Sequence, residues 1–208
     1  GEVLQYLNED IQNEFLKELN AKQVAEITEG LATDDLVDIL QQLPQKITSQ
    51  VLSAMDEQDR SRVETVLSYN EDTAGGLMNT DTITVRPAHT LELILRYLRR
   101  HDALPEMTDN LYVVNREDEF MGAIPLRTLL VSDPSTLASE VMLDGVKGVH
   151  VDMDAEHVAQ LFERYDWVSA PVISTDNKLL GRITIDDIVD VIRDSTEHSF
   201  MSMAGLDE

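Results

Sequence analysis

Four carboxylates recur at helical spacing near the end of the chain, and together they could bind a divalent cation. They are Asp187, Asp190, Asp194 and Glu197, at steps of three, four and three residues, so they share one side of an α-helix. Arg193 is expected to lie off this acidic stripe, which leaves the repulsion between its carboxylates uncompensated. Carboxylate oxygens are the ligands that hard cations such as Mg²⁺ prefer. The alternative is a solvated acidic helix face without a ligand.

The stretch from Leu179 to His198 must position these acids. Residues 179–183 are expected to form a short strand with a bend at Gly181, and a helix is expected from about Ile185. The apolar residues of that helix fall on the side opposite to the stripe: Ile185, Ile188, Val189 and Ile192. The sequence therefore predicts a strand–helix junction with one apolar and one acidic side.

The overall charge excludes several classes of partner. The 208 residues include 40 acidic and 16 basic side chains, with a formal net charge of −24 and a pI near 4.3. Nucleic acid is excluded because its binding depends on Lys and Arg, and an anionic membrane surface would repel the chain. The absence of cysteine excludes disulfides and thiolate metal sites. No apolar run approaches the roughly 20 residues that span a bilayer and no signal peptide is visible, so the chain as given is expected to be soluble.

Residues 1–69 are expected to be entirely helical. Apolar residues recur at three- and four-residue steps over residues 3–19, again after Gly30, over 47–55, and in a fourth segment that begins with Asp56 as its N-cap. Short amphipathic helices with tight connections predict a helical superhelix or small bundle. Capping and helix-dipole effects explain most of the acids in this region. It contains no catalytic constellation, so we interpret it as a docking or packing domain.

Beyond residues 69–78 the chain repeats itself. Gly75 and Gly76 break the helical period, and a β-branched run follows at 83–85. Three landmarks of the first copy match the second at one constant offset: Val113-Val114 with Val172-Ile173, Gly122 with Gly181, and Thr128 with Asp187. Each copy is predicted to be β-α-β-β-α. The predicted fold class is α plus α/β, with an N-terminal all-α superhelical domain followed by two such repeats.

The repeats resemble a tandem pair of CBS domains over roughly residues 78–194. The segment Gly181-Arg-Ile-Thr184-Ile-Asp186-Asp187 is similar to that family's G-x-x-(S/T)-x-x-D signature. The resemblance implies a site for ATP or another adenine nucleotide, in which the Thr184 hydroxyl faces a phosphate and Asp187 accepts hydrogen bonds from the ribose. Trp167 could stack on the adenine. The alternatives are helix capping for Thr184 and Asp187, and core packing for Trp167.

The first repeat departs from the signature. Pro125 stands in the place of the hydroxyl residue and Thr128 in the place of the acid. This repeat is therefore expected to lack a standard nucleotide site of its own, although Arg127 could still reach phosphates. Any nucleotide site is assigned to the second repeat.

The order of helical domain, connector and CBS pair resembles the cytosolic part of MgtE-type magnesium channels and transporters. Residues 71–78, Glu-Asp-Thr-Ala-Gly-Gly-Leu-Met, match the (E/D)-D-x-A-G-G-L-M connector of that family, for which a simple linker is the alternative. The resemblance implies an excised regulatory fragment, on the cytoplasmic side of the inner membrane, whose transmembrane pore domain is missing. It implies these domains: a helical N domain at 1–69, truncated at its start, a connector at 70–77, CBS repeats at 78–136 and 137–197, and the start of a link to the pore at 198–208.

The same resemblance implies a Mg²⁺ sensor that forms a homodimer through its CBS domains. Mg²⁺ bound between acidic surfaces of the N and CBS domains would favour a compact state that shuts the pore. Besides the stripe, the matching acids are Asp72 in the connector, Asp154 and Glu156 at the first helix of the second repeat, and Asp166. Each has a helix-terminus or solvated-acid alternative. The family usually has a further acid where this chain has His198, which weakens the match there.

Two other classes of function stay open from the sequence. One is a phosphodiesterase or phosphatase that uses paired metal ions, but the chain lacks a His-Asp metal motif and its five histidines show no ligand spacing, so an enzyme is not predicted. The other is an adenine-nucleotide sensor, in which the CBS pair responds to ATP or AMP and regulates an attached membrane or enzyme domain.

Overall fold

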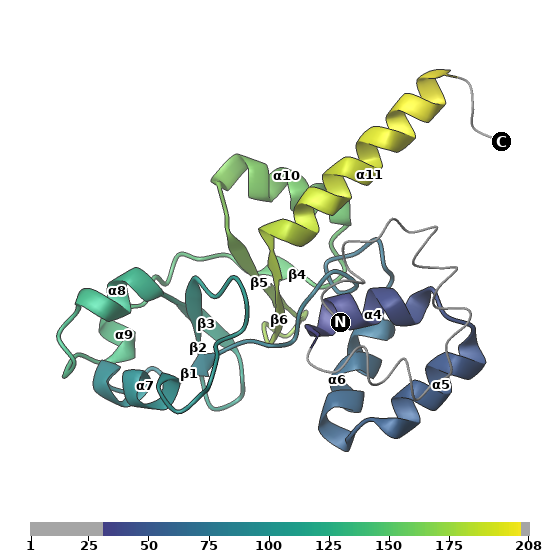
Figure 1. Ribbon diagram of the computed structural model, residues 1–208. Helices are drawn as coiled ribbons and strands as arrows, with labels where there is room; N and C mark the ends of the chain where they lie inside the picture. Colours follow the sequence, from purple (N-terminus) through teal and green to yellow (C-terminus); the bar gives the residue numbers. More distant parts are fainter. Residues whose placement is uncertain (1–30, 205–208) are drawn as a thin grey trace. The chain divides into compact units, whose positions relative to one another are not determined.

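The computed structural model describes residues 31–204 and, within the last helix, the side chains as far as Arg193 together with that of Ser195 (Figure 1). The chain divides into two compact units between Glu71 and Asp72. The helix that the sequence predicts over residues 3–19 lies outside the described residues.

The described part of the first unit, residues 31–71, is helical and contains no strand. Its helices are α4 (Thr33–Gln41), α5 (Gln45–Ala54) and α6 (Glu57–Leu67). Helix α4 packs against α6, and the unit buries a set of aliphatic side chains: Leu36, Val37, Ile39, Leu40, Val51, Val63 and Val66. Asp56 is the N-cap of α6, because its carboxylate accepts hydrogen bonds from the backbone N–H groups of Gln58 at 2.9 Å and Asp59 at 3.0 Å. The N-cap predicted from the sequence is confirmed.

Asp34, in the first turn of α4, is a buried acid. Its carboxylate accepts a hydrogen bond from the backbone N–H of Asp35 at 3.0 Å. Removal from water raises the pKa of Asp34 to about 7, and the negative charges of Asp35 and Asp38 act in the same direction. A large fraction of Asp34 is therefore protonated near neutral pH.

The second unit consists of two repeats with the same order of elements. Each has a three-stranded sheet that joins a parallel pair to an antiparallel hairpin, in the orders β1-β2-β3 and β4-β5-β6. The first repeat contains β1 (Thr84–Val85), α7 (Leu91–Leu98), β2 (Asn110–Val114), β3 (Phe120–Pro125) and α8 (Leu126–Val131), followed by α9 (Ala138–Val141). The second contains β4 (Val149–His150), α10 (Ala155–Tyr165), β5 (Ser169–Ile173), β6 (Leu179–Thr184) and α11 (Ile185–Ala204). The predicted β-α-β-β-α order is confirmed in both repeats.

Helices cover one face of the first sheet, and its other face carries a second apolar cluster that contacts residues of the second repeat. In the first repeat the buried cluster joins α7, β2 and α8 through Leu91, Leu111 and Leu129. In the second, α10 and α11 pack against each other (Figure 1). None of the helices among the described residues, α11 included, is both long enough and apolar enough to cross a membrane.

A short segment that precedes each repeat pairs with the sheet of the other repeat. Asn79, ahead of the first repeat, pairs with Arg182 in β6, with backbone N···O distances of 2.8 and 2.9 Å. Leu143, ahead of the second repeat, pairs with Ala123 in β3 at 2.8 and 3.2 Å. Each repeat therefore completes the sheet of its neighbour, and the two repeats form one interlocked unit.

Gly181 permits this close approach and does not form a bend. Strand β6 runs without interruption from Leu179 to Thr184 and bulges at Leu180, where its register with β5 shifts. The bend predicted at Gly181 is therefore wrong. A Cβ atom on Gly181 would lie 2.6 Å from the carbonyl oxygen of Asn79. Glycine is needed here because a second backbone passes over it.

Candidate ligand-binding site

The junction of β6 and α11 joins the two residues predicted to bind a nucleotide. The backbone N–H of Thr184 donates to Oδ2 of Asp187 at 3.2 Å, and the Thr184 hydroxyl donates to the same oxygen at 3.1 Å. The same hydroxyl proton is shared with Oδ1 of Asp186 in a three-centre hydrogen bond. Thr184 is buried and Asp187 half-buried. A carboxylate three residues into a helix that accepts from the residue ahead of it is a capping arrangement, so both residues stabilise the start of α11, and a ligand would compete with these bonds.

Asp186 was not among the predicted site residues, although its carboxylate touches the signature hydroxyl. Its place inside the signature, next to Asp187, is the signal that could have identified it. Thr184 therefore has two carboxylates beside it, whereas the nucleotide signature needs only one acid to bind the ribose.

The acidic stripe on α11 differs from its prediction. Arg193 forms an ion pair with Asp190, with Nη2 and Oδ1 2.7 Å apart, so the expectation that the stripe lacks a basic partner is wrong. The physical reason is reach, because a long Arg side chain can cover a residue one turn away even from an adjacent row of the helix. The side chains of Asp194 and Glu197 lie outside the described residues.

Three other predicted metal ligands lie together at the start of α10. The carbonyl oxygen of Asp72 accepts a hydrogen bond from the N–H of Ala155 at 2.9 Å, and Thr73 forms a β-bridge with Asp154. Asp154 is the N-cap of α10, since its carboxylate accepts from the N–H of Glu156 at 3.0 Å. The structure therefore brings an acid of the connector beside two acids of the second repeat. All three are exposed.

The carboxylates of Asp72, Asp154 and Glu156 are of the type that binds a hard cation, but they do not form a complete coordination site. Within residues 31–193, whose side chains the structure describes, no three acidic or histidine side chains are arranged to hold a metal ion. A cation at Asp72, Asp154 and Glu156 would therefore be held by one or two carboxylates and by water, which is the usual manner of Mg²⁺ binding.

Trp167 belongs to an aromatic group at the end of α10. Its ring stacks on Tyr165, with centroids 5.3 Å apart, and meets the ring of Phe162 edge-on at 5.6 Å. Asp166 is exposed and forms the left-handed C-cap of α10, with φ of 52°. Tyr165 covers one face of the Trp167 indole, so a stacking ligand would need the opposite face.

The equivalent junction of the first repeat carries a different set of groups. Pro125 is the N-cap of α8 and makes no side-chain cap. The carbonyl oxygen of Thr128 accepts hydrogen bonds from the N–H and the hydroxyl of Ser132 at 3.1 and 2.7 Å. Arg127 is exposed. The paired hydroxyl and carboxylate seen at Thr184 and Asp187 have no counterpart among these residues.

A buried polar network, which the sequence reasoning missed, joins the two repeats near Thr184. The hydroxyl of Ser169 donates to Oδ1 of Asp109 at 2.5 Å and lies 3.0 Å from the hydroxyl of Tyr112. Burial raises the pKa of Tyr112 to about 12, so its phenol is neutral. The buried Arg182 donates to the carbonyl oxygens of Met107, at 3.0 Å, and Glu106. An arginine in the middle of an otherwise apolar strand was the signal for this network.

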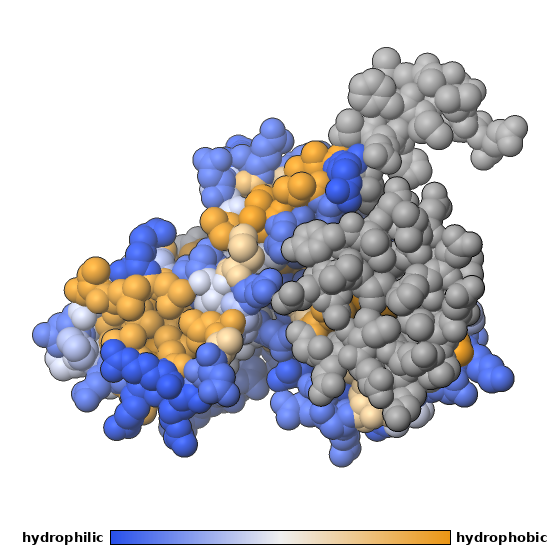
Figure 2. Space-filling model, in the orientation of Figure 1, coloured by the Kyte–Doolittle hydropathy of each residue, from blue (hydrophilic) through white to orange (hydrophobic). Residues whose placement is uncertain are grey.

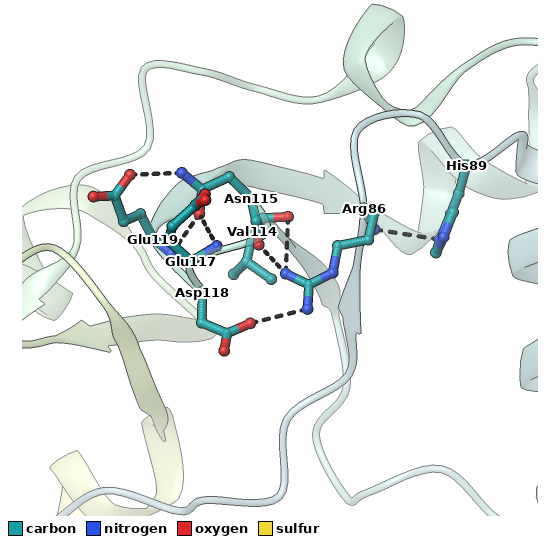
Figure 3. Close-up of polar contacts among 7 residues, drawn as sticks. All are labelled: Arg86, His89, Val114, Asn115, Glu117, Asp118 and Glu119. Carbon is teal, nitrogen blue, oxygen red and sulfur yellow. Dashed lines mark hydrogen bonds and ion pairs between the residues drawn. The ribbon is translucent and has the colours of Figure 1, made fainter.

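The β-hairpin turns of the two repeats also contact each other. The N–H of Phe120 donates to the carbonyl oxygen of Asn177 at 2.8 Å, and the N–H of Leu179 donates to that of Asp118 at 3.1 Å. Arg86 holds the first of these turns, as Figure 3 shows. Its guanidinium donates to the carbonyl oxygen of Asn115 and to Oδ1 of Asp118, the latter at 3.0 Å. Arg86 is thus a clamp within one repeat.

Large apolar side chains remain exposed on α8 and α11. Figure 2 shows apolar surface over the first repeat and along α11. On α8, Leu130 and Val131 are 71% and 85% exposed, and on α11 Val189 and Ile192 are 54% and 44% exposed. Contiguous apolar surface of this kind is typical of an interface.

Comparison with known proteins assigns both units. Residues 1–72 match the family model for the MgtE intracellular N domain, and residues 74–133 and 138–194 match the CBS domain. The magnesium transporter MgtE of Thermus thermophilus is 35% identical over 210 residues, which cover all of this chain and 47% of that protein. MgtE of Enterococcus faecalis is 34% identical over 150 residues, covering 72% of this chain and 33% of that protein. The chain thus spans less than half the length of these relatives.

The fold agrees with a solved structure of the same kind. The crystal structure of the cytosolic domain of the Mg²⁺ channel MgtE in complex with ATP is 38% identical, with a TM-score of 0.84, and the match covers 91% of this chain and 78% of that one. Sequence and fold agree along nearly the whole chain. The chain therefore belongs to the MgtE family and contains its N domain followed by its pair of CBS domains.

Proposed function

We propose that the chain is the Mg²⁺-sensing regulatory region of a magnesium transporter or channel, held on the cytoplasmic side of the membrane by a transmembrane pore domain. Relatives named magnesium transporters support the substrate class. The observation that carries the sensing role is the gathering of Asp72, Asp154 and Glu156 at the start of α10. An acid next to the N domain thereby lies beside acids of the second CBS repeat.

The physical basis of sensing is charge repulsion that a divalent ion reverses. A chain of net charge −24 repels its own acidic surfaces. Monovalent salt screens such charges beyond about 8 Å but does not bridge facing carboxylates. Mg²⁺ held between the N domain and the CBS pair would favour the compact arrangement by its difference in affinity for the two states. Weak sites, at which the bound Mg²⁺ keeps several of its water ligands, suit a sensor of the free Mg²⁺ concentration.

The regulatory unit is proposed to be a homodimer through the CBS repeats. The exposed apolar residues of α8 and α11 support this, because a second copy would remove them from water: Leu130, Val131, Val189 and Ile192. Such a dimer brings together twice the net charge of one chain, which makes a divalent counter-ion more effective.

Small-angle scattering tests the sensing role. The radius of gyration should fall when EDTA is replaced by about 10–20 mM Mg²⁺, on the order of a weak hard-cation site, and KCl of equal ionic strength should not reproduce the change. Scattering profiles that superimpose with EDTA and with Mg²⁺ would show that the sensor proposal is wrong.

A second ligand, ATP, is proposed for the Thr184–Asp187 junction. The support is the relative crystallised in complex with ATP, together with the hydroxyl and carboxylate that this chain places in contact at the start of α11. Calorimetric titration with ATP tests it. Asp187→Ala should weaken binding, Thr128→Ala in the first repeat should not, and no heat of binding to the wild-type chain would exclude the site.

A further inference from the structure

We infer that Arg182 and Asp109 are positioning residues for the proposed nucleotide site, because they hold residues 106–112 of the first repeat against β6, which ends in Thr184, and against its partner strand β5. The inference rests on the proposed ATP site and extends it. Neither residue belongs to the hydroxyl-and-acid pair, and neither is proposed to touch the ligand.

Arg182 provides the first clamp. Arg182 is 4% exposed, and its Nη1 and Nη2 atoms donate to the carbonyl oxygens of Met107, at 3.0 Å, and Glu106. Its own backbone pairs with Asn79 at 2.8 and 2.9 Å. One residue of β6 therefore ties down both the connector and the loop that leads into β2.

Asp109 provides the second clamp. Oδ1 of its carboxylate accepts from the hydroxyl of Ser169 at 2.5 Å, and Oδ2 accepts from the side-chain amide of Asn110 at 2.7 Å. Tyr112, three residues further along the chain, lies 3.0 Å from the same Ser169 hydroxyl. Three residues at the start of β2 are thus linked to one hydroxyl of β5: Asp109 and Tyr112 directly, and Asn110 through Asp109.

Both clamps act on the face of the sheet that carries the signature hydroxyl. Side chains alternate along a strand, so Arg182 and Thr184 point to the same face of β6. Ser169 is the cross-strand partner of Thr184, and directly opposed residues share a face. Arg182 and Asp109 therefore help to set the distance between the first repeat and Thr184. A ligand held between Thr184 and the first repeat would be sensitive to that distance, because supporting contacts determine how closely a site is held to its binding geometry.

Stability alone is a poor explanation for Arg182. Among the described residues its guanidinium pairs with no carboxylate, and its acceptors are neutral carbonyl groups. Burying a cation without a counter-charge is unfavourable. The carbonyl groups of Glu106 and Met107 belong to exposed residues, which water can reach if the arginine is removed. Loss of the clamp should therefore change ligand binding more than it changes the melting temperature.

The test is calorimetric titration of ATP at a fixed Mg²⁺ concentration and well below the melting temperature. Four proteins are compared at the same oligomeric state: wild type, Arg182→Met, Arg182→Lys and Arg86→Met. Arg86→Met is the matched control, because it removes an arginine clamp on a carbonyl oxygen and a carboxylate within the first repeat (Figure 3). Arg182→Met should weaken ATP binding by about tenfold, the value expected when one charge-assisted hydrogen bond no longer positions the site. Arg182→Lys should recover part of the affinity, and Arg86→Met should bind ATP as the wild type does.

The possible outcomes separate this inference from the function on which it rests. If the wild type does not bind ATP, the nucleotide site is excluded and the inference with it. If the wild type binds ATP and Arg182→Met binds it equally well, the inference alone is overturned. Equal weakening of ATP binding by Arg182→Met and Arg86→Met would also overturn it, because the effect would then be one of general destabilisation. A weakening of ATP binding that accompanies a matching loss of melting temperature in Arg182→Met would overturn it for the same reason.

Discussion

The carbonyl oxygen of Asp72 accepts a 2.9 Å hydrogen bond from the backbone N–H of Ala155, which attaches the connector to the start of α10. The next residues continue the attachment: the N–H groups of Ala74 and Gly75 donate to the carbonyl oxygens of Met153, at 2.7 Å, and Val151, at 2.8 Å. Gly75 and Gly76 are buried, so this glycine pair is part of the second unit and not a free linker. Any metal bound by Asp72 and Asp154 would therefore sit at the point where the chain enters the CBS pair.

Asp154→Asn should separate the capping role of this residue from its proposed metal role. Asn is as good an N-cap as Asp, so the variant should unfold like the wild type without Mg²⁺ but gain less melting temperature when Mg²⁺ is added. Asp154→Ala should lose both the N-cap and the Mg²⁺ response, and the loss of the N-cap should lower the free energy of unfolding by about 1 kcal/mol. Thermal unfolding with EDTA and with Mg²⁺ measures both effects.

The control for this pair is Asp56, which caps α6 in the first unit by the same kind of bond. Asp56→Asn should leave the Mg²⁺ response unchanged. A wild-type Mg²⁺ response in Asp154→Asn would remove Asp154 from the proposed metal ligands.

Gly181→Ala should destabilise the second unit by about 1–3 kcal/mol, because the new methyl group overpacks a closely fitted contact. Its Cβ would lie 2.6 Å from the carbonyl oxygen of Asn79. Gly145→Ala is the matched control, since no atom beyond its own chain neighbours lies within 4 Å of the Cβ built there, and it should change stability by less than about 0.5 kcal/mol. Urea unfolding of both variants measures the difference, and equal stability would show that the connector can shift without cost.

Asp34→Asn should stabilise the first unit above neutral pH. The pKa of Asp34 in the folded chain is about 7, above its ordinary value of 3.8, so the fold favours the protonated acid. The contribution of Asp34 to stability is therefore greatest below pH 3.8 and is lost as the pH rises through 7. Asn cannot ionise, so the variant should gain about 1–3 kcal/mol over the wild type near pH 8 and little near pH 4. A gain of equal size at both pH values would contradict the assigned cause.

Val131→Glu combined with Val189→Glu should convert the proposed dimer into a monomer. Both side chains are more than half exposed in a single chain, so the substitutions should leave the fold intact while placing unpaired charge in the interface. Sedimentation at micromolar concentration with Mg²⁺ measures the change. Met121→Glu, at an exposed position on β3, should remain dimeric, and a wild-type chain that is monomeric at all Mg²⁺ concentrations would exclude the dimer.

Local structure was readable from the sequence because it depends on neighbours in the chain. The 3.6-residue period of apolar side chains, Asp56 as an N-cap, and the change from strand to helix between Thr184 and Ile185 all follow from contacts within one turn or one strand. The repeat was readable for a related reason. Gly122 and Gly181 stand at equivalent places because the same backbone approach occurs in each repeat, against Leu143 and Asn79.

Only the tertiary structure decided which distant groups meet. Asn79 pairs with a strand about a hundred residues away, and no periodicity in the sequence reports such a partner, since pairing between segments depends on how whole sheets pack. The burial that moves the pKa of Asp34 arises in the same way, as does the placement of Arg182 on the carbonyl groups of a loop in the other repeat. The prediction of a bend at Gly181 was wrong because the sequence does not report that the backbone of Asn79 passes over this glycine. Glycine marks a turn, where it supplies a left-handed backbone conformation, and also a close approach, where another backbone lies above it.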